Sequence, residues 1–515
     1  MSRALKCLLV VSVLLCGAVP ARAAEDQALE RGSAVIDPAI LRELDHGRLG
    51  LGRMLAPERS ADTLLSNRDL FGLPAMVPVR EALDREFDRY VAKHQASLPN
   101  ESIGIGDGFA FQLFDRTLLQ SPDVRFVLAG IVNRMDRAYV APKACGEIRL
   151  IYRLTRTDVP LIGENAVSQR LPMTLNLVLK AKGGGNDGSL SCREIARRWL
   201  ATGGAQPAME KLFGKDGPLD LIDARNIDRI ETNLQIAHAP KSAVRDFRTD
   251  YLLKVFDYDG AAKRFAEAPL ENQIDRDRIL ADEALRRDFK AWLLDPGHFA
   301  ELDRGTVLIP DRFLATGAVA PTPAGFDVSE LEPEFGMVQG EGTAGNAVFS
   351  EGDVVGALQK AAADGTKLQN IQSLAGFERR LNDVTCAGCH QTRGIGGFHF
   401  PGVDWMAARP SNSTVVPASP HFFGDQPRRR DILASFRDGE APDFSRGFSN
   451  RPQLRASAEL AGTEYSDGWG AHCYLPGAKP AETDRSFRGW TCAEGLACQV
   501  AGKTSRMGMC FVKGR

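Results

Sequence analysis

The stretch GEIRLIYRL, residues 146–154, shows how the central part of this chain folds. Every second position in it is apolar: Ile148, Leu150, Tyr152 and Leu154. The stretch LPMTLNLVLK, residues 171–180, has the same period, with Met173, Leu175, Leu177 and Leu179. Successive side chains of a β-strand point to opposite faces of its sheet, so a period of two predicts strands with one buried face.

Strand patterns continue on both sides of these stretches. RFVLAGIVNRM (125–135) is a near-continuous apolar run, and RIETNLQI (229–236) alternates apolar and polar residues. YLLKVFDYDGAAKRF (251–265) predicts two strands around a turn at Asp259 and Gly260. No regular crossover helices separate these runs, so we expect a mainly antiparallel sheet in a multidomain α+β protein.

One helix in this region has a recognisable start. Ser191 and Glu194 have the spacing of a capping box, and Ile195, Trp199 and Leu200 form an apolar face after them. Cys192 lies in the first turn of this helix. We expect it to form a disulfide with Cys145, which precedes the 146–154 strand, and so to link helix and sheet.

The N-terminus has the pattern of a secretory signal peptide over residues 1–23. Arg3 and Lys6 precede the apolar run Leu8–Leu15, and Ala21-Arg22-Ala23 provides small residues for cleavage. No later apolar run reaches the roughly 20 residues that a transmembrane helix needs. The sequence therefore predicts a periplasmic or secreted bacterial protein without a membrane span after signal removal.

The composition narrows the choice of partner. Lys and Arg total 64 against 66 Asp and Glu, which gives a net charge of −2 in a chain of 515 residues. A balanced charge argues against nucleic acid or an anionic membrane as the main partner.

The ten cysteines fall into three groups. Cys7 and Cys16 lie in the signal peptide, and Cys386 and Cys389 belong to a separate motif. The remaining six predict three disulfides in an exported chain. Besides Cys145 and Cys192, these are the four cysteines of the tail, whose pairing the sequence leaves open: Cys473, Cys492, Cys498 and Cys510.

The separate motif lies in TCAGCHQTRGIGGFHF, residues 385–400. Two cysteines separated by two residues and followed at once by a histidine form the pattern that attaches haem covalently. A random chain of this composition contains that pattern only about 0.003 times. A preceding amphipathic helix is predicted from Leu374, Phe377, Leu381 and Val384, which share one face.

This segment, about 370–440, resembles the small c-type cytochromes, in which a helix leads into the same motif. The resemblance implies one covalent haem c, with Cys386 and Cys389 as thioether attachments and His390 as the axial iron ligand. Nearby aromatic residues could surround the haem or could equally form a core without it: Phe398, Phe400, Trp405, Phe422 and Phe423.

The resemblance does not extend to a sixth iron ligand. Such cytochromes usually supply a methionine several tens of residues downstream, but residues 421–506 contain none. The candidates are His399, His421, Met406 or no protein ligand. A haem iron with two strong axial ligands can only transfer electrons, whereas an iron with one open coordination position can also bind a small molecule.

Two alternatives to haem remain at this motif. Zinc could be bound by Cys386, Cys389 and His390 with His399 as a fourth ligand. Alternatively, Cys386 and Cys389 could form a structural disulfide.

We therefore expect five parts in the chain: signal peptide 1–23, a mostly helical region 24–120, an α+β domain 121–320, a haem segment 321–457 and a disulfide-rich module 458–515. The Pro-rich stretch 315–325 is expected to be an interdomain linker. The stretches 130–136, 145–154, 192–200 and 229–236 are also similar to uncharacterised exported bacterial proteins, a similarity that implies no activity.

Electron transfer or haem-dependent oxidoreductase activity is the leading functional hypothesis, with an unknown redox partner protein or small molecule. The alternative is a secreted binding or surface protein whose cytochrome-like segment is structural and haem-free. The sequence identifies no catalytic residues, since it contains no Walker A, HExxH or GxSxG string.

Overall fold

The computed structural model describes residues 34–58, 64–158, 170–181, 190–202, 208–220, 222–239, 248–322, 348–392, 405–406, 426–446, 472–475, 496–499 and 507–512. The predicted signal peptide, His399 and His421 lie outside these residues.

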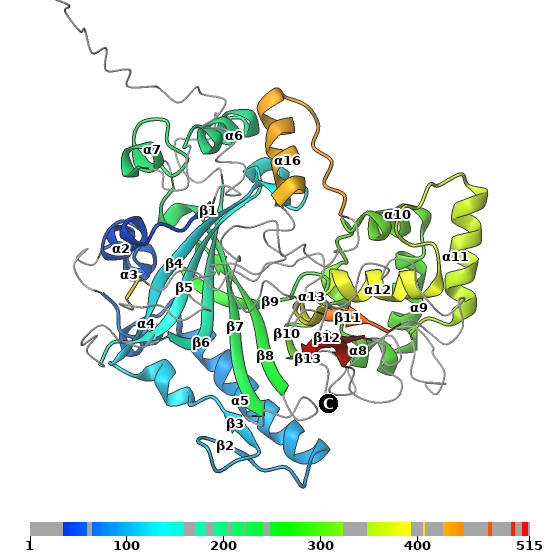
Figure 1. Ribbon diagram of the computed structural model, residues 1–515, viewed down its shortest axis with the longest axis horizontal. Coiled ribbons are helices and arrows are strands. Elements are labelled where there is room, and N and C mark those ends of the chain that lie inside the picture. Colours follow the sequence, from blue (N-terminus) through cyan, green and yellow to red (C-terminus); the bar gives the residue numbers. More distant parts are fainter. Residues whose placement is uncertain are drawn as a thin grey trace, which may run out of the picture.

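A large, mainly antiparallel sheet forms the centre of the described structure (Figure 1). Its main path runs β1-β4-β5-β6-β7-β3-β2, and β8 pairs with the other edge of β7. The strands are β1 (Ala34–Val35), β2 (Ile103–Gly104), β3 (Phe111–Leu113), β4 (Val124–Arg134), β5 (Glu147–Arg156), β6 (Arg170–Lys180), β7 (Ile227–Ala239), β8 (Arg248–Asp259), β9 (Arg264–Ala268) and β10 (Gly317–Thr322). Antiparallel pairing dominates, as the sequence predicts.

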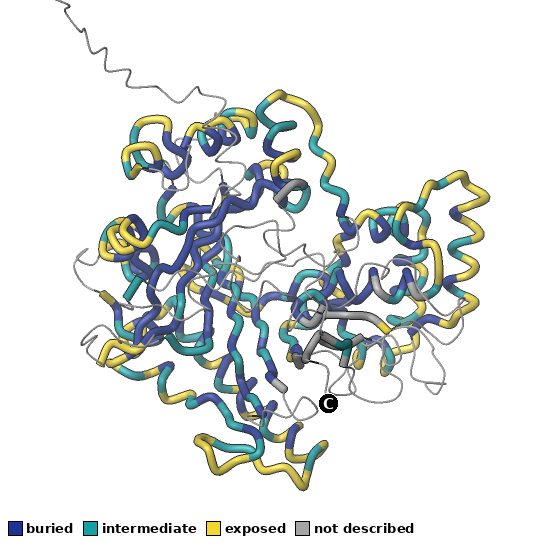
Figure 2. Tube along the Cα trace, in the orientation of Figure 1, coloured by how far each residue is buried: buried dark blue, intermediate teal, exposed yellow. Residues whose placement is uncertain are grey.

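One face of this sheet is packed against helices. The apolar positions of β5, β6 and β7 join a single core with residues of these helices, and Figure 2 shows that the strands are buried along most of their length. The helices are α2 (Pro38–His46), α3 (Leu51–Leu55), α4 (Asn67–Gly72), α5 (Val77–Ser97), α6 (Cys192–Ala201) and α7 (Met209–Phe213). The region expected to be a separate N-terminal part, 24–120, therefore contributes α2–α5 to the core of the sheet.

A second hydrophobic cluster lies beside the β8 edge of the sheet (Figure 1). Its centre is aromatic, with Phe289 packed on Phe313 and Phe349, and Phe299 stacked on Phe377. Its helices are α8 (Arg276–Ala281), α9 (Glu283–Leu293), α10 (Pro296–Arg304), α11 (Glu351–Ala363) and α12 (Leu374–Val384). Because the cluster runs from Ile274 to Leu381, the boundary expected at 320/321 passes through it.

The remaining elements are short or peripheral. Helix α13 (Cys386–Thr392) follows α12, and α16 (Gln426–Asp438) packs against α6. Single turns of 3-10 helix are η1 (Arg116–Gln120), η2 (Met135–Arg137), η3 (Pro142–Ala144), η4 (Ala224–Asn226) and η5 (Asp311–Phe313). No helix in the described part of the chain is long and apolar enough to cross a membrane.

The predicted helix and its disulfide are both present. The Ser191 side chain accepts a hydrogen bond from the Glu194 backbone N–H at 3.2 Å, which caps the start of α6. Cys192 forms the disulfide with Cys145, so the helix is covalently joined to the loop before β5.

The stretch 315–325 differs from the linker that its composition predicts. Residues Gly317–Thr322 form β10, which pairs antiparallel with the edge of β8. Main-chain hydrogen bonds need no large side chains, so small residues can form a strand as well as a linker. Ala320 is fully buried where β10 lies next to α13.

The described part of the tail is a small antiparallel sheet of β11 (His472–Tyr474), β13 (Met507–Val512) and β12 (Leu496–Gln499). Cys498 is disulfide-bonded and lies opposite Cys510 in the strand register. Cys473 lies on β11, and Cys492 lies outside the described residues.

Candidate functional site

The Cys-x-x-Cys-His motif occupies the start of α13, directly after the amphipathic helix α12. Phe377 and Leu381 of α12 are buried in the second hydrophobic cluster, with Leu374 and Val384 packed against it, as the sequence predicts. Thr385 has an extended backbone between the two helices, and its hydroxyl accepts a hydrogen bond from the Gly388 backbone N–H at 2.9 Å. The motif is therefore held on a sharp, capped turn.

Helix α13 is attached to the sheet domain through its first turn. Ala387 packs against Ala320 of β10, and these two small side chains let the helix and strand approach closely. The Ala387 backbone N–H donates to Gln273 Oε1 at 2.9 Å. These contacts fix the motif relative to the face of the sheet that carries no helices of the first core.

Cys386 and Cys389 are both thiols in the structure, with no disulfide between them. The Cys386 thiol donates to the Glu271 backbone carbonyl at 3.4 Å. Burial raises the pKa of the Cys386 thiol well above its ordinary value, and the nearby Glu271 and Glu231 carboxylates raise it further. A thiol held neutral in this way differs from the low-pKa cysteines of thiol–disulfide oxidoreductases.

His390 points from α13 to strands β7 and β8. Its Nε2 lies 3.1 Å from Nδ2 of Asn233 on β7. Its ring packs on Tyr251 of β8, with ring centroids 4.4 Å apart. The sheet therefore fixes the orientation of this imidazole.

Cys386, Cys389 and His390 line one cavity of about 650 Å³ between α13 and the sheet. This volume falls in the range of pockets that bind cofactors and other small molecules. The sheet contributes a polar wall on the face opposite the first core, which includes Asn176, Arg149, Arg229, Glu231 and Asn233.

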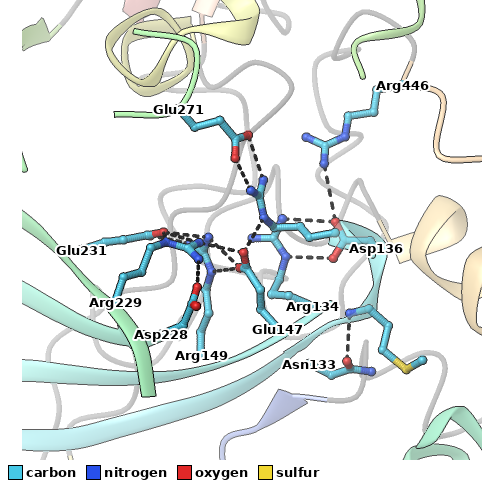
Figure 3. A network of polar contacts seen from close by, with 12 residues as sticks. Asn133, Arg134, Asp136, Glu147, Arg149, Asp228, Arg229, Glu231, Glu271 and Arg446 are labelled. Atoms are coloured by element: carbon cyan, nitrogen blue, oxygen red, sulfur yellow. Dashed lines mark hydrogen bonds and ion pairs between the residues drawn. The ribbon is translucent and has the colours of Figure 1, made fainter. Parts of the chain in front are cut away.

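A network of buried ion pairs forms much of that wall (Figure 3). Glu147 lies at its centre and accepts hydrogen bonds from Arg137, Arg149 and Arg229 at 3.1, 3.2 and 2.7 Å. Burial alone would raise the pKa of Glu147, but these three guanidinium groups hold it well below its ordinary value. Glu231 accepts from Arg149 at 2.7 Å and from Arg229 at 2.8 Å.

The network extends from Glu147 toward Glu271 in one direction and toward Asp136 in the other (Figure 3). Arg137 pairs with Glu271, whose carbonyl accepts from the Cys386 thiol, so the network reaches the motif. At the other end Asp136 accepts from Arg134 at 2.8 Å and from Arg428 of α16 at 3.1 Å. Burial opposes ionisation of Asp136, yet Arg134, Arg429 and Arg428 hold its pKa well below its ordinary value.

The other predicted site residues are placed differently. His399 and His421 lie outside the described residues, and Met406 is described but does not line the cavity. Trp405 does not line it either: its indole N–H donates to the Leu128 carbonyl of β4 at 2.8 Å, and its ring contacts His46.

The charge network is the part of the site that sequence reasoning missed. The sequence does contain a pattern that indicates this network. Glu147 and Arg149 alternate with the apolar residues of β5, and Arg229 and Glu231 alternate with those of β7. Opposite charges on the outward face of two strands look like an ordinary solvated surface until another element covers them.

The donor set at the motif is the one that a covalently attached haem requires, and His390 Nε2 would have to leave its contact with Asn233 to hold the iron. Two thiols and an imidazole face one cavity of adequate volume, and arginine side chains in its wall can pair with propionate carboxylates. Among the described residues, no group of three or more His, Cys, Asp or Glu side chains is arranged to hold a metal ion by itself.

Comparisons of the chain with protein-family models, with curated proteins and with solved structures found no match.

Proposed function

We propose that this protein is an exported c-type haem protein that serves electron transfer or haem-dependent oxidation and reduction. One haem is attached through Cys386 and Cys389, and His390 is the axial ligand of its iron. The observation that carries the proposal is that these three side chains line one cavity, with both cysteines present as thiols. The cytochrome-like segment and the exported location are parts of the same proposal.

The chain's own residues would orient the bound haem. The hydrogen bond of α13 to Gln273 and its packing on Ala320 fix the position of the motif relative to the sheet. Arg149 and Arg229 in the cavity wall are already oriented by Glu147 and Glu231, so they can meet anionic groups with little loss of side-chain entropy. The haem supplies the redox chemistry of its iron.

A second candidate function is the binding of a polar ligand without haem by a secreted protein. The charged wall of the cavity favours it, because ordered arginine and glutamate side chains suit polar groups. In this case the motif has a structural role only, with His390 held by Asn233.

The mass of the exported, purified full-length chain distinguishes the haem protein from the haem-free binding protein. We expect production in a host that matures c-type cytochromes to add the mass of one haem per chain, retained under denaturing conditions. Cys386→Ala and Cys389→Ala should each leave one thioether, and the double variant should carry no covalent haem. The matched control is the same chain made without the maturation machinery. A colourless, folded protein with the mass of its amino acids alone would overturn the haem proposal and favour the second candidate.

A further inference from the structure

We infer that Glu271 is a positioning residue of the haem site. It joins the turn Leu270–Gln273 to Arg137 of the ion-pair network, and through this turn it fixes the place of Cys386 and supplies a negative charge beside it. The inference rests on the proposed haem function and deepens it, because it gives one side chain a part in setting the reduction potential of the iron.

The turn Leu270–Gln273 is held by main-chain and side-chain hydrogen bonds. Its first N–H donates to the Ala315 carbonyl at 2.9 Å, and the Ala315 N–H donates to its last carbonyl at 2.8 Å. Asn272 has a left-handed backbone conformation with a φ of 57°, and its side-chain amide donates to the Val307 carbonyl at 2.9 Å. The turn is therefore fixed both to the segment before β10 and to the second hydrophobic cluster.

The same turn contacts the motif at two points. Gln273 Oε1 accepts a hydrogen bond from the Ala387 N–H at 2.9 Å, and the Glu271 carbonyl accepts from the Cys386 thiol at 3.4 Å. A thioether sulfur has no proton to donate, so the hydrogen bond between Ala387 and Gln273 is the one that remains when haem is attached at Cys386. The first turn of α13 therefore follows the position of the turn Leu270–Gln273.

The Glu271 side chain connects this turn to the sheet (Figure 3). Nη1 of Arg137 donates to one of its carboxylate oxygens at 3.2 Å, and Nη2 donates to the other. Arg137 is itself buried and also donates to Glu147 at 3.1 Å. A bidentate pair of this kind fixes orientation as well as distance, so Glu271 links the position of the motif to that of the ion-pair network.

The Glu271 carboxylate also acts on the motif through its charge. Burial is the largest cause of the raised pKa of the Cys386 thiol, and Glu271 is the next, ahead of Glu231. Arg137 opposes these two carboxylates with a smaller effect on the same pKa. Ferric iron carries one positive charge more than ferrous iron, so a carboxylate near the attachment point of the haem favours the ferric state and lowers the reduction potential.

A spectroscopic redox titration of the exported full-length haem protein tests this effect. Glu271→Gln keeps the size of the side chain and removes its charge. We expect it to retain covalent haem and to raise the ratio of ferrous to ferric protein roughly tenfold at a fixed potential, a shift of about 59 mV for one electron. Glu271→Asp keeps the charge and should restore most of the wild-type potential.

The matched control for the titration is Asp257→Asn on β8. Asp257 is an exposed carboxylate that lines the same cavity and lies opposite Arg229 in the strand register. Its replacement removes one negative charge from the cavity and leaves the turn Leu270–Gln273 unaltered. Because an exposed charge is screened by water and salt, we expect the same ratio to change by less than about twofold.

Hydrogen exchange tests the positioning role in the full-length chain made without haem. Glu271→Ala removes both carboxylate oxygens and so releases the turn from Arg137. We expect the backbone amides of α13 to exchange roughly fivefold faster than in the wild type, the effect of losing about one hydrogen bond. The amides of α9, in the second hydrophobic cluster, should keep their wild-type rates.

Three outcomes would count against the inference in different ways. Wild-type exchange rates in α13 of Glu271→Ala would overturn the positioning role. A reduction potential that Glu271→Gln leaves unchanged, or that Asp257→Asn shifts as far, would overturn the role of the Glu271 charge. Absence of covalent haem from the wild-type chain would instead overturn the proposed function, while the exchange measurement would still decide whether Glu271 positions the motif.

Discussion

At the scale of single residues, the tight junction between α12 and α13 requires a glycine at position 388. A Cβ atom at this position would lie 2.1 Å from the Asn382 carbonyl oxygen and 2.8 Å from the Thr385 hydroxyl oxygen. The nearer atom is backbone and cannot rotate away, so α12 and α13 could not keep their present junction. The glycine within the motif is thus a packing requirement of this particular turn.

We predict that Gly388→Ala lowers the free energy of unfolding by about 1–3 kcal/mol, the range of other overpacked sites. Urea titration of the purified protein measures the change. Gly356→Ala on α11 is the control: no atom lies within 4 Å of its added Cβ, so we expect equal or slightly greater stability. Equal unfolding curves for Gly388→Ala and wild type would show that the junction is not as tight as described.

At the scale of secondary-structure elements, the Cys145–Cys192 disulfide joins α6 to the sheet across a sequence separation of 47 residues. Loop closure of this length predicts a loss of about 4 kcal/mol when both cysteines are replaced by serine, because the unfolded chain gains freedom. Unfolding with and without a reducing agent measures it. Because the double variant keeps the disulfide at Cys498, the reductant should destabilise the wild type by about 4 kcal/mol more than it destabilises the variant, and an equal response of both proteins would contradict the prediction.

The elements themselves were largely predictable, and their partners were not. Alternation in β5 and β7 predicted both the strands and their buried faces, because the side-chain period of a strand is a local property. The pairing of β10 with β8 depends on main-chain groups far apart in sequence, so the small residues around Gly317 looked like a linker. The motif could likewise be identified from Cys386, Cys389 and His390, which are close in sequence. The charged cavity wall opposite the motif could not be predicted, because its residues come from distant strands.

At the scale of the whole molecule, buried charges connect parts that are distant in the sequence. Arg137 pairs with Glu147 at the start of β5 and with Glu271, whose backbone carbonyl accepts from the Cys386 thiol of the motif. Asp136 joins the sheet to Arg428 of α16 and, at 3.8 Å, to Arg446. Each of these ion pairs replaces contacts with water, so the arrangement persists only while the carboxyl groups remain ionised.

This dependence predicts how stability changes with pH. The pKa values of Asp136 and Glu147 are lower in the folded than in the unfolded chain, where carboxyl groups titrate near pH 4. The unfolded chain therefore binds more protons as the pH falls, which favours unfolding. Their contribution is complete above roughly pH 5 and is lost progressively as the pH falls toward the folded pKa values.

Thermal unfolding between pH 7 and pH 3 tests this with Glu147→Gln, which leaves Arg137, Arg149 and Arg229 without their shared carboxylate. We expect a loss of about 3–5 kcal/mol at pH 7, the cost of breaking a buried ion pair, and a shallower decline in acid because one titrating group is gone. Glu283→Gln is the control, since its pair with Arg287 is exposed on α9 and adds little to stability. It should follow the wild-type curve. If Glu147→Gln instead ran parallel to the wild type at all pH values, the acid sensitivity would arise outside this network, and the ion pairs around the cavity would not be what holds the sheet, the motif and α16 together.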